Sequence, residues 1–172
     1  MDLRARMQAR LEELEFNFEE FSEGRFVTWL EERRGYRIIF VPLSMPPTQF
    51  GAWIEDACDR VDYIFYERDT IALHQAHIKL HEMCHIICGH PTLVLGEEGQ
   101  ARALLRQASA DPSALEPLLR STIHSDQMEA EAETLAALIQ ERVVRSQGLE
   151  KLISLVSSNK EMEEYLKAME LN

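Results

Sequence analysis

The sequence predicts an α+β domain that is mostly helical and contains a small β-sheet. Apolar residues recur at helical spacing toward both ends of the chain, whereas three short segments between them are rich in β-branched and aromatic residues. The order helices, strands, helices is typical of this class. A chain of 172 residues can bury its own core, so we expect residues 1–172 to form a single domain.

Two helices are expected before the strands. An apolar stripe at steps of three and four covers residues 3–21, and Gly24 ends it. A second helix over residues 25–34 ends at Gly35. Strands are then expected over three segments, the first closed by Pro42, and these segments are residues 36–43, 51–56 and 61–68.

Helices are expected over most of the remaining chain. The segment 113–124 is the least regular, because Pro117 is tolerated only near a helix start. The segment 125–147 has the clearest apolar periodicity and is closed by Gly148. The full set of expected helices covers residues 70–88, 100–108, 113–124, 125–147 and 149–170.

The composition excludes several classes of protein. The net charge is −12 and no basic stripe is visible, which argues against direct binding to nucleic acid or to anionic membranes. No apolar run approaches the ~18 residues that a membrane-spanning helix needs. The N-terminal segment lacks the apolar region of a signal peptide, and three cysteines form no disulfide framework. We therefore expect a cytoplasmic protein.

The stretch KLHEMCHIICGH, residues 79–90, carries the chemistry. His81 and His85 lie four residues apart, so on a helix they differ by about 40° and face one side. Two imidazoles in this arrangement can share one metal ion. Glu82 flanks them without having to bind the metal, which is the position of a general base. The segment also has a separate core face, for which we expect Leu73, Leu80, Met83, Cys84 and Ile87.

Other residues of this helix allow alternative interpretations. His77 and His81 are also four apart, but no acid follows His77, so we expect His74 and His77 to be wall residues or satisfied surface histidines. Cys88 falls near the same sector and is either a small buried hydrophobe or an oxidisable thiol. His90 follows Gly89 and is expected to be a cap or loop residue.

A carboxylate from a later helix is the expected third ligand. Position 91, where an extended H-E-x-x-H motif would place a third histidine, is a proline. In DQMEAEAETLAALI, Glu129 borders the expected buried face and is assigned as the ligand, with Glu131 as the alternative. Glu133, one turn further, can hydrogen-bond a ligand histidine. Without a metal, all three would be solvated surface residues. The expected buried face is Met128, Ala132, Leu135, Ala136, Ile139 and Val143.

These two stretches resemble the ImmA/IrrE family of zinc metallopeptidases. HEMCHIICGH is similar to the family's first motif, and EAEAETLAALI to its second. The resemblance covers about residues 36–142 and implies a zincin-like metallopeptidase domain with one Zn²⁺ ion held by His81, His85 and Glu129, and with Glu82 as the catalytic acid. It also implies a protein substrate that is a helix-turn-helix transcriptional repressor. LIQERVV departs from the family's L-L-M-P segment, which concerns the substrate side of the site.

The expected activity is that of a zinc-dependent endopeptidase in which Glu82 moves protons. An edge strand over residues 61–68 could hold an extended substrate, and His124 or Tyr63 could stabilise the oxyanion. Two alternatives remain: a non-catalytic zinc module that sequesters a repressor, and a hydrolase of small substrates. Glu82 argues against the first, and the shape of the cavity distinguishes the second.

Overall fold

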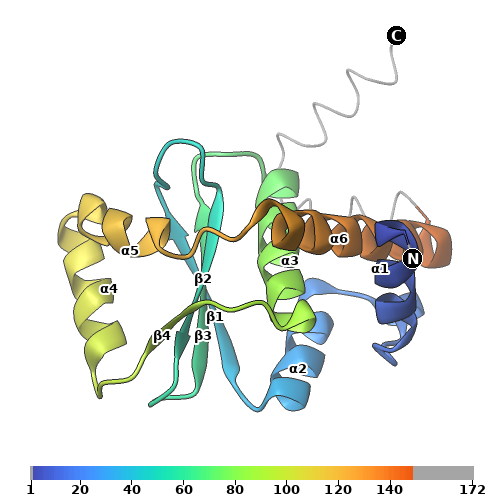
Figure 1. Ribbon diagram of the computed structural model, residues 1–172, viewed down its shortest axis with the longest axis horizontal. Coiled ribbons are helices and arrows are strands. Elements are labelled where there is room, and N and C mark those ends of the chain that lie inside the picture. Colours follow the sequence, from blue (N-terminus) through green and yellow to red (C-terminus); the bar gives the residue numbers. More distant parts are fainter. Residues whose placement is uncertain (1, 149–172) are drawn as a thin grey trace, which may run out of the picture.

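The computed structural model describes residues 2–148. Within them, six α-helices and a small four-stranded mixed sheet form an α+β fold that is mostly helical, which confirms the predicted class. Figure 1 shows the sheet between two groups of helices. One group is α4 (Gln100–Ala110) and α5 (Glu116–Arg120), and the other is α1 (Leu3–Glu12), α2 (Glu23–Arg34), α3 (Ala72–Cys88) and α6 (Asp126–Gln147). The helix expected over residues 149–170 lies outside the described residues.

The sheet has the order β1-β3-β2-β4. Its strands are β1 (Arg37–Leu43), β2 (Gly51–Asp56), β3 (Val61–Glu67) and β4 (Leu93–Leu95). β3 pairs in parallel with β1 and antiparallel with β2, and β4 adds to β2 in parallel. The segment 61–68 was expected to be an edge strand, and this prediction is wrong, because both of its edges are already paired. β4 was not predicted.

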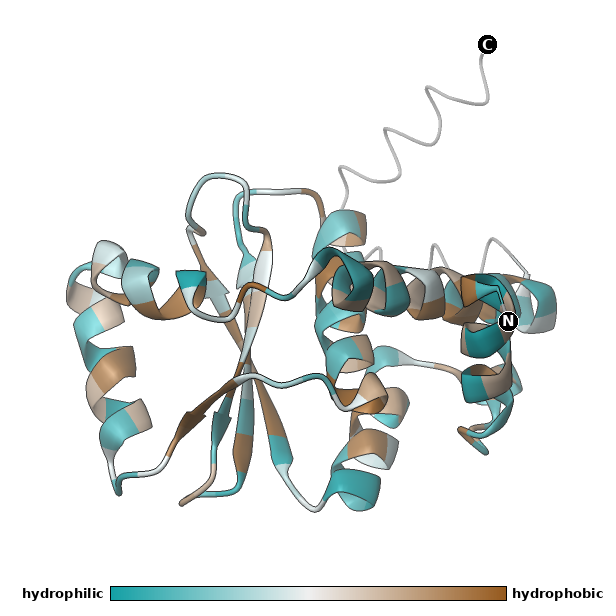
Figure 2. Ribbon diagram, in the orientation of Figure 1, coloured by the Kyte–Doolittle hydropathy of each residue, from teal (hydrophilic) through white to brown (hydrophobic). Residues whose placement is uncertain are grey.

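Each face of the sheet covers its own apolar core. Side chains alternate between the faces of a strand, so neighbours on β2 belong to different cores: Trp53 packs with α1, α2, α3 and α6, whereas Ala52 and Ile54 pack with α4 and α5. Figure 2 shows hydrophobic residues along the strands and in bands on the helices. No helix in residues 2–148 has the length and apolar character needed to cross a membrane.

The first helix is shorter than its apolar spacing predicts. α1 ends at Glu12, and Glu15 takes a left-handed conformation with a φ of 54°, which breaks the helix. Phe16 then makes edge-to-face contacts with Phe26 and Trp29 of α2. The phenylalanines after Glu12 therefore belong to an aromatic cluster, and the only regular structure among them is a short 3₁₀ turn (Phe18–Glu20).

Helices α3 and α6 pack against each other and carry the two predicted motifs. α3 ends at Gly89, whose φ of 71° is the left-handed C-cap conformation that glycine adopts readily. α6 begins after Ser125, whose hydroxyl accepts a hydrogen bond from the Met128 amide. The expected core face of α3 is wrong at Leu73, which is exposed, and Ile78 is buried instead.

Candidate metal centre

Three side chains from α3 and α6 converge on one point. Nε2 of His81 lies 3.0 Å from Nε2 of His85 and 3.1 Å from Oε2 of Glu129. Oε1 of Glu129 lies 3.6 Å from Nε2 of His85. His81 and His85 face α6 because they are one helical turn apart, and Glu129 lies in the first turn of α6. This group could hold one metal ion.

The spacing of the candidate donor atoms fits a small divalent cation. Bonds of about 2.0–2.1 Å to a tetrahedral ion place neighbouring donor atoms roughly 3.3 Å apart. The two imidazole nitrogens are 3.0 Å apart, and Oε2 of Glu129 lies 3.1 Å from that of His81. The other carboxylate oxygen, Oε1, lies 3.6 Å from that of His85. Two imidazole nitrogens and one carboxylate oxygen are also the donor set of catalytic zinc sites that keep an open fourth position.

The two histidines have different outer partners. Nδ1 of His81 lies 3.3 Å from Oε2 of Glu133, as expected for Glu133. Nδ1 of His85 lies 2.8 Å from Nδ1 of His90, so His90 is more than a cap or loop residue. Glu131, the alternative ligand, lies away from the metal group, and its Oε2 is 3.2 Å from Nε2 of His90.

The local electrostatics favour an anionic donor beside two imidazoles. Hydrogen bonds with His124 and His81 hold the pKa of Glu129 well below its usual range. Burial lowers the pKa of His85 to about 4, so His85 is neutral at physiological pH. Burial is the largest single effect on His81 and disfavours its charged form, but the hydrogen bond with Glu129 and the charges of Glu82, Glu129 and Glu133 together outweigh it, so its pKa is raised.

Glu82 lies beside the metal group with its carboxylate turned toward the first residue of β2. Its side chain is buried, and burial raises its pKa to about 7. It forms no hydrogen bond with another residue of the described chain. A Cβ atom at Gly51 would lie 2.5 Å from Oε1 of Glu82 and 2.7 Å from Cγ2 of Ile78. Only glycine therefore leaves room for the carboxylate in this position.

A cavity of about 510 Å³ opens onto the metal group and onto Glu82. Its walls are residues 47–52, one side of α3, several residues between α5 and α6, and the first turns of α6 with Glu129 and Glu133. His74 and His77 line it, as expected for wall residues, and His77 is satisfied by Glu133 at 3.1 Å. Phe50 and Ile123 are exposed at the same cavity.

His124 lines the cavity, whereas Tyr63 does not. The ring of His124 stacks on that of His85 with 3.9 Å between centroids, and its Nε2 donates to the carbonyl oxygen of Pro91 at 2.8 Å. Tyr63 is buried in the core on the α4 side of the sheet, so its expected role at the oxyanion is wrong. Sequence reasoning missed Gly51, because its contact with Glu82 joins distant segments.

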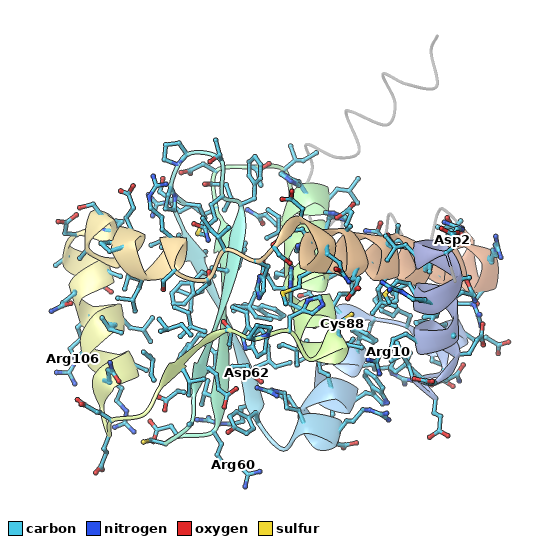
Figure 3. All side chains as sticks on the ribbon, viewed as in Figure 1. Asp2, Arg10, Arg60, Asp62, Cys88 and Arg106 are labelled. Carbon is cyan, nitrogen blue, oxygen red and sulfur yellow. The ribbon has the colours of Figure 1, made fainter. Side chains whose placement is uncertain are left out.

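Cys88 lies at the C-terminal end of α3 (Figure 3). It is half-buried and packs against the core that contains α1 and α6. Burial raises the pKa of its thiol to about 11, which disfavours the reactive thiolate form at neutral pH. These properties are those of a small packed hydrophobe.

Comparison with models of protein families, with curated proteins and with solved structures found no match to this chain. The class of the protein therefore rests on its own residues. Fold and site together define an α+β protein with a candidate metal centre of the H-E-x-x-H type, completed by a glutamate from a later helix.

Proposed function

We propose that this protein is a zinc-dependent metallo-endopeptidase that hydrolyses a peptide bond in a helix-turn-helix repressor. The observation that carries the proposal is the position and environment of Glu82. Its carboxylate lies in the wall of the cavity beside the metal group, without a hydrogen-bond partner in the described chain and with a pKa of about 7. A site that only holds a metal needs no such group, whereas a general base is most effective when its pKa is near the working pH.

In this mechanism His81, His85 and Glu129 hold the ion, and Glu82 moves protons. A bound Zn²⁺ ion supplies Lewis acidity, which polarises a carbonyl oxygen and makes water more acidic. Glu82 accepts a proton from the attacking water and then donates it to the leaving amine of the substrate. His124 lies on the cavity side of the group, next to Glu129 at 3.5 Å, where it helps to orient this carboxylate.

The first residues of β2 support a substrate with an extended backbone. β4 pairs only with Ile54–Asp56, so Gly51 and Ala52 have no strand on that side within the described residues. Both residues line the cavity. A free strand edge can bind an extended peptide through main-chain hydrogen bonds. That the substrate is a repressor rests on the resemblance of the two sequence motifs alone.

The substitution Glu82→Gln tests the proposal, because it keeps the size of the side chain and removes its basicity. We expect the variant to fold and to bind zinc, but to lose about 10²–10⁴-fold or more in cleavage rate. The probe is the purified helix-turn-helix protein encoded nearest to this gene, and a library of peptides from the host proteome widens the search. New N-termini are identified by mass spectrometry.

Gly51→Ala provides a second test that leaves every functional group intact. The added methyl group would occupy the space of Oε1 of Glu82, so cleavage should fall while zinc binding persists. If the wild-type protein releases the repressor from its promoter without cleaving it, and Glu82→Gln does so equally well, the protein is a sequestering module. Cleavage of small amide substrates alone would indicate the hydrolase of small substrates.

A further inference from the structure

A chain of hydrogen bonds leads from the candidate ligand His85 away from the cavity and into the protein. Nδ1 of His85 and Nδ1 of His90 are 2.8 Å apart, Nε2 of His90 is 3.2 Å from Oε2 of Glu131, and Oε1 of Glu131 accepts from Arg6 at 2.6 Å. We propose that His90 and Glu131 are positioning residues that fix His85 as a metal ligand. The inference rests on the metal centre of the proposed function and names residues that lie outside it.

The donor and acceptor groups of these side chains set the direction of each hydrogen bond. A carboxylate only accepts, so His90 donates its Nε2 proton to Glu131. In a neutral ring, Nδ1 of His90 then carries a lone pair and accepts from Nδ1 of His85. His85 keeps its lone pair on Nε2, the nitrogen that faces His81 and Glu129. The chain therefore selects the one tautomer of His85 that can bind a metal at this point.

Burial makes these partners hard to replace with water. The side chains of His85 and His90 are 1% and 6% exposed, and that of Glu131 is 18% exposed. Arg6 of α1 holds the second oxygen of Glu131, so the carboxylate cannot turn away freely. A ligand histidine that donates its other N–H to a fixed acceptor is oriented and made more basic.

The same series of hydrogen bonds gives separate roles to the two glutamates of the E-A-E segment at the start of α6. Glu129 turns toward the metal group, and Glu131 turns toward His90 and Arg6. His90 reaches His85 because the polypeptide backbone reverses direction at Gly89, the left-handed C-cap of α3. A histidine just past the helix end is thereby brought behind the ligand that lies five residues before it.

The affinity of the purified full chain for zinc, measured by competition with a chromophoric chelator, tests the proposal. We expect His90→Phe and Glu131→Ala each to weaken binding by about 10–100-fold, the effect of losing an outer partner. Because Glu131 acts through His90, the double variant should lose no more than His90→Phe alone. His90→Asn should restore part of the affinity, since its side-chain oxygen can accept from Nδ1 of His85.

Glu141→Ala is the matched control, because Glu141 also joins α6 to α1, through Arg4 at 2.8 Å, but touches no candidate ligand. It should bind zinc like the wild type. Thermal unfolding of the metal-free variants checks that each one folds, and Glu131→Ala remains the test if His90→Phe does not. Unchanged affinity in the folded variants, or additive losses in the double variant, would overturn the proposal while the metal centre stands. Absence of zinc binding by the wild type would overturn both.

Discussion

His81 and His85 are the same residue type on one side of one helix, yet the structure surrounds them differently. The side chain of His81 is 17% exposed and its outer partner, Glu133, is 56% exposed. The side chain of His85 is 1% exposed, and its outer partner His90 is 6% exposed. The spacing of the motif selects the pair, whereas depth in the fold decides how each member is held. His81 is the ligand on the cavity side, and His85 is the ligand anchored in the core.

The difference also separates the two imidazoles electrostatically. Burial lowers the pKa of His85 to about 4. The pKa of His81 is raised, because its hydrogen bond with Glu129 and the neighbouring carboxylates together outweigh the effect of its burial. Without metal, protonated His81 can donate to Glu129 while His85 stays neutral. A metal ion that binds between them replaces the proton of His81.

The largest expected effect comes from removing either ligand histidine. It also tests whether the two histidines contribute differently to the stability of the metal-free protein. His81→Ala and His85→Ala should both abolish tight zinc binding, with losses beyond the ~10–100-fold of an outer partner. In the metal-free protein only His85→Ala should be clearly destabilising, because it leaves the buried Nδ1 of His90 without a partner, which costs about 1–3 kcal/mol. Urea unfolding measures this. Equal losses of stability in both variants would remove the distinction between core and cavity ligands.

A smaller effect is expected from the outer partner of His81. Glu133 is exposed, so water can take its place when Glu133→Ala removes the carboxylate. We expect a loss of zinc affinity of less than about tenfold, the lower limit for outer partners. Chelator competition gives the value, and Glu141→Ala is again the control on the same helix. A loss as large as that of His90→Phe would show that burial does not decide the importance of an outer partner.

The sequence was sufficient to predict the main elements of the site. Helical periodicity placed the motif on α3 and the glutamates on α6, because such spacing is local information. It could not place residues whose roles depend on contacts between distant segments. Gly51 approaches Glu82 from β2, and His90 reaches His85 only because of the turn at Gly89. Both are tertiary contacts, which the periodicity of the sequence cannot predict.

The errors in the fold have the same origin. Apolar spacing continued the first helix through Phe18 and Phe21, but these rings pack in an aromatic cluster after the helix has ended. β3 was expected at an edge because its sequence does not reveal that β1 also pairs with it, although β2 lies between β1 and β3 in the sequence. β4 has only three residues, Leu93–Leu95, too few for a period to show. The hydrophobic pattern indicates which residues are buried, whereas the topology determines which other residues they pack against.

The smallest effect is a difference in titration between the two histidines in the metal-free protein. His85 should titrate near pH 4 and His81 above the ordinary value of 6.5, which NMR of the imidazole nitrogens in the presence of chelator can measure. The sign of the effect on stability differs for the two. His85 has a lowered pKa when folded, so its contribution is complete above about pH 6.5 and is lost as the pH falls through about 4. His81 has a raised pKa, so its contribution is complete below its unfolded value and is lost as the pH rises through its folded value. If both rings titrated together near 6.5, their surroundings would be equivalent, and the contrast between the core ligand and the cavity ligand would fail.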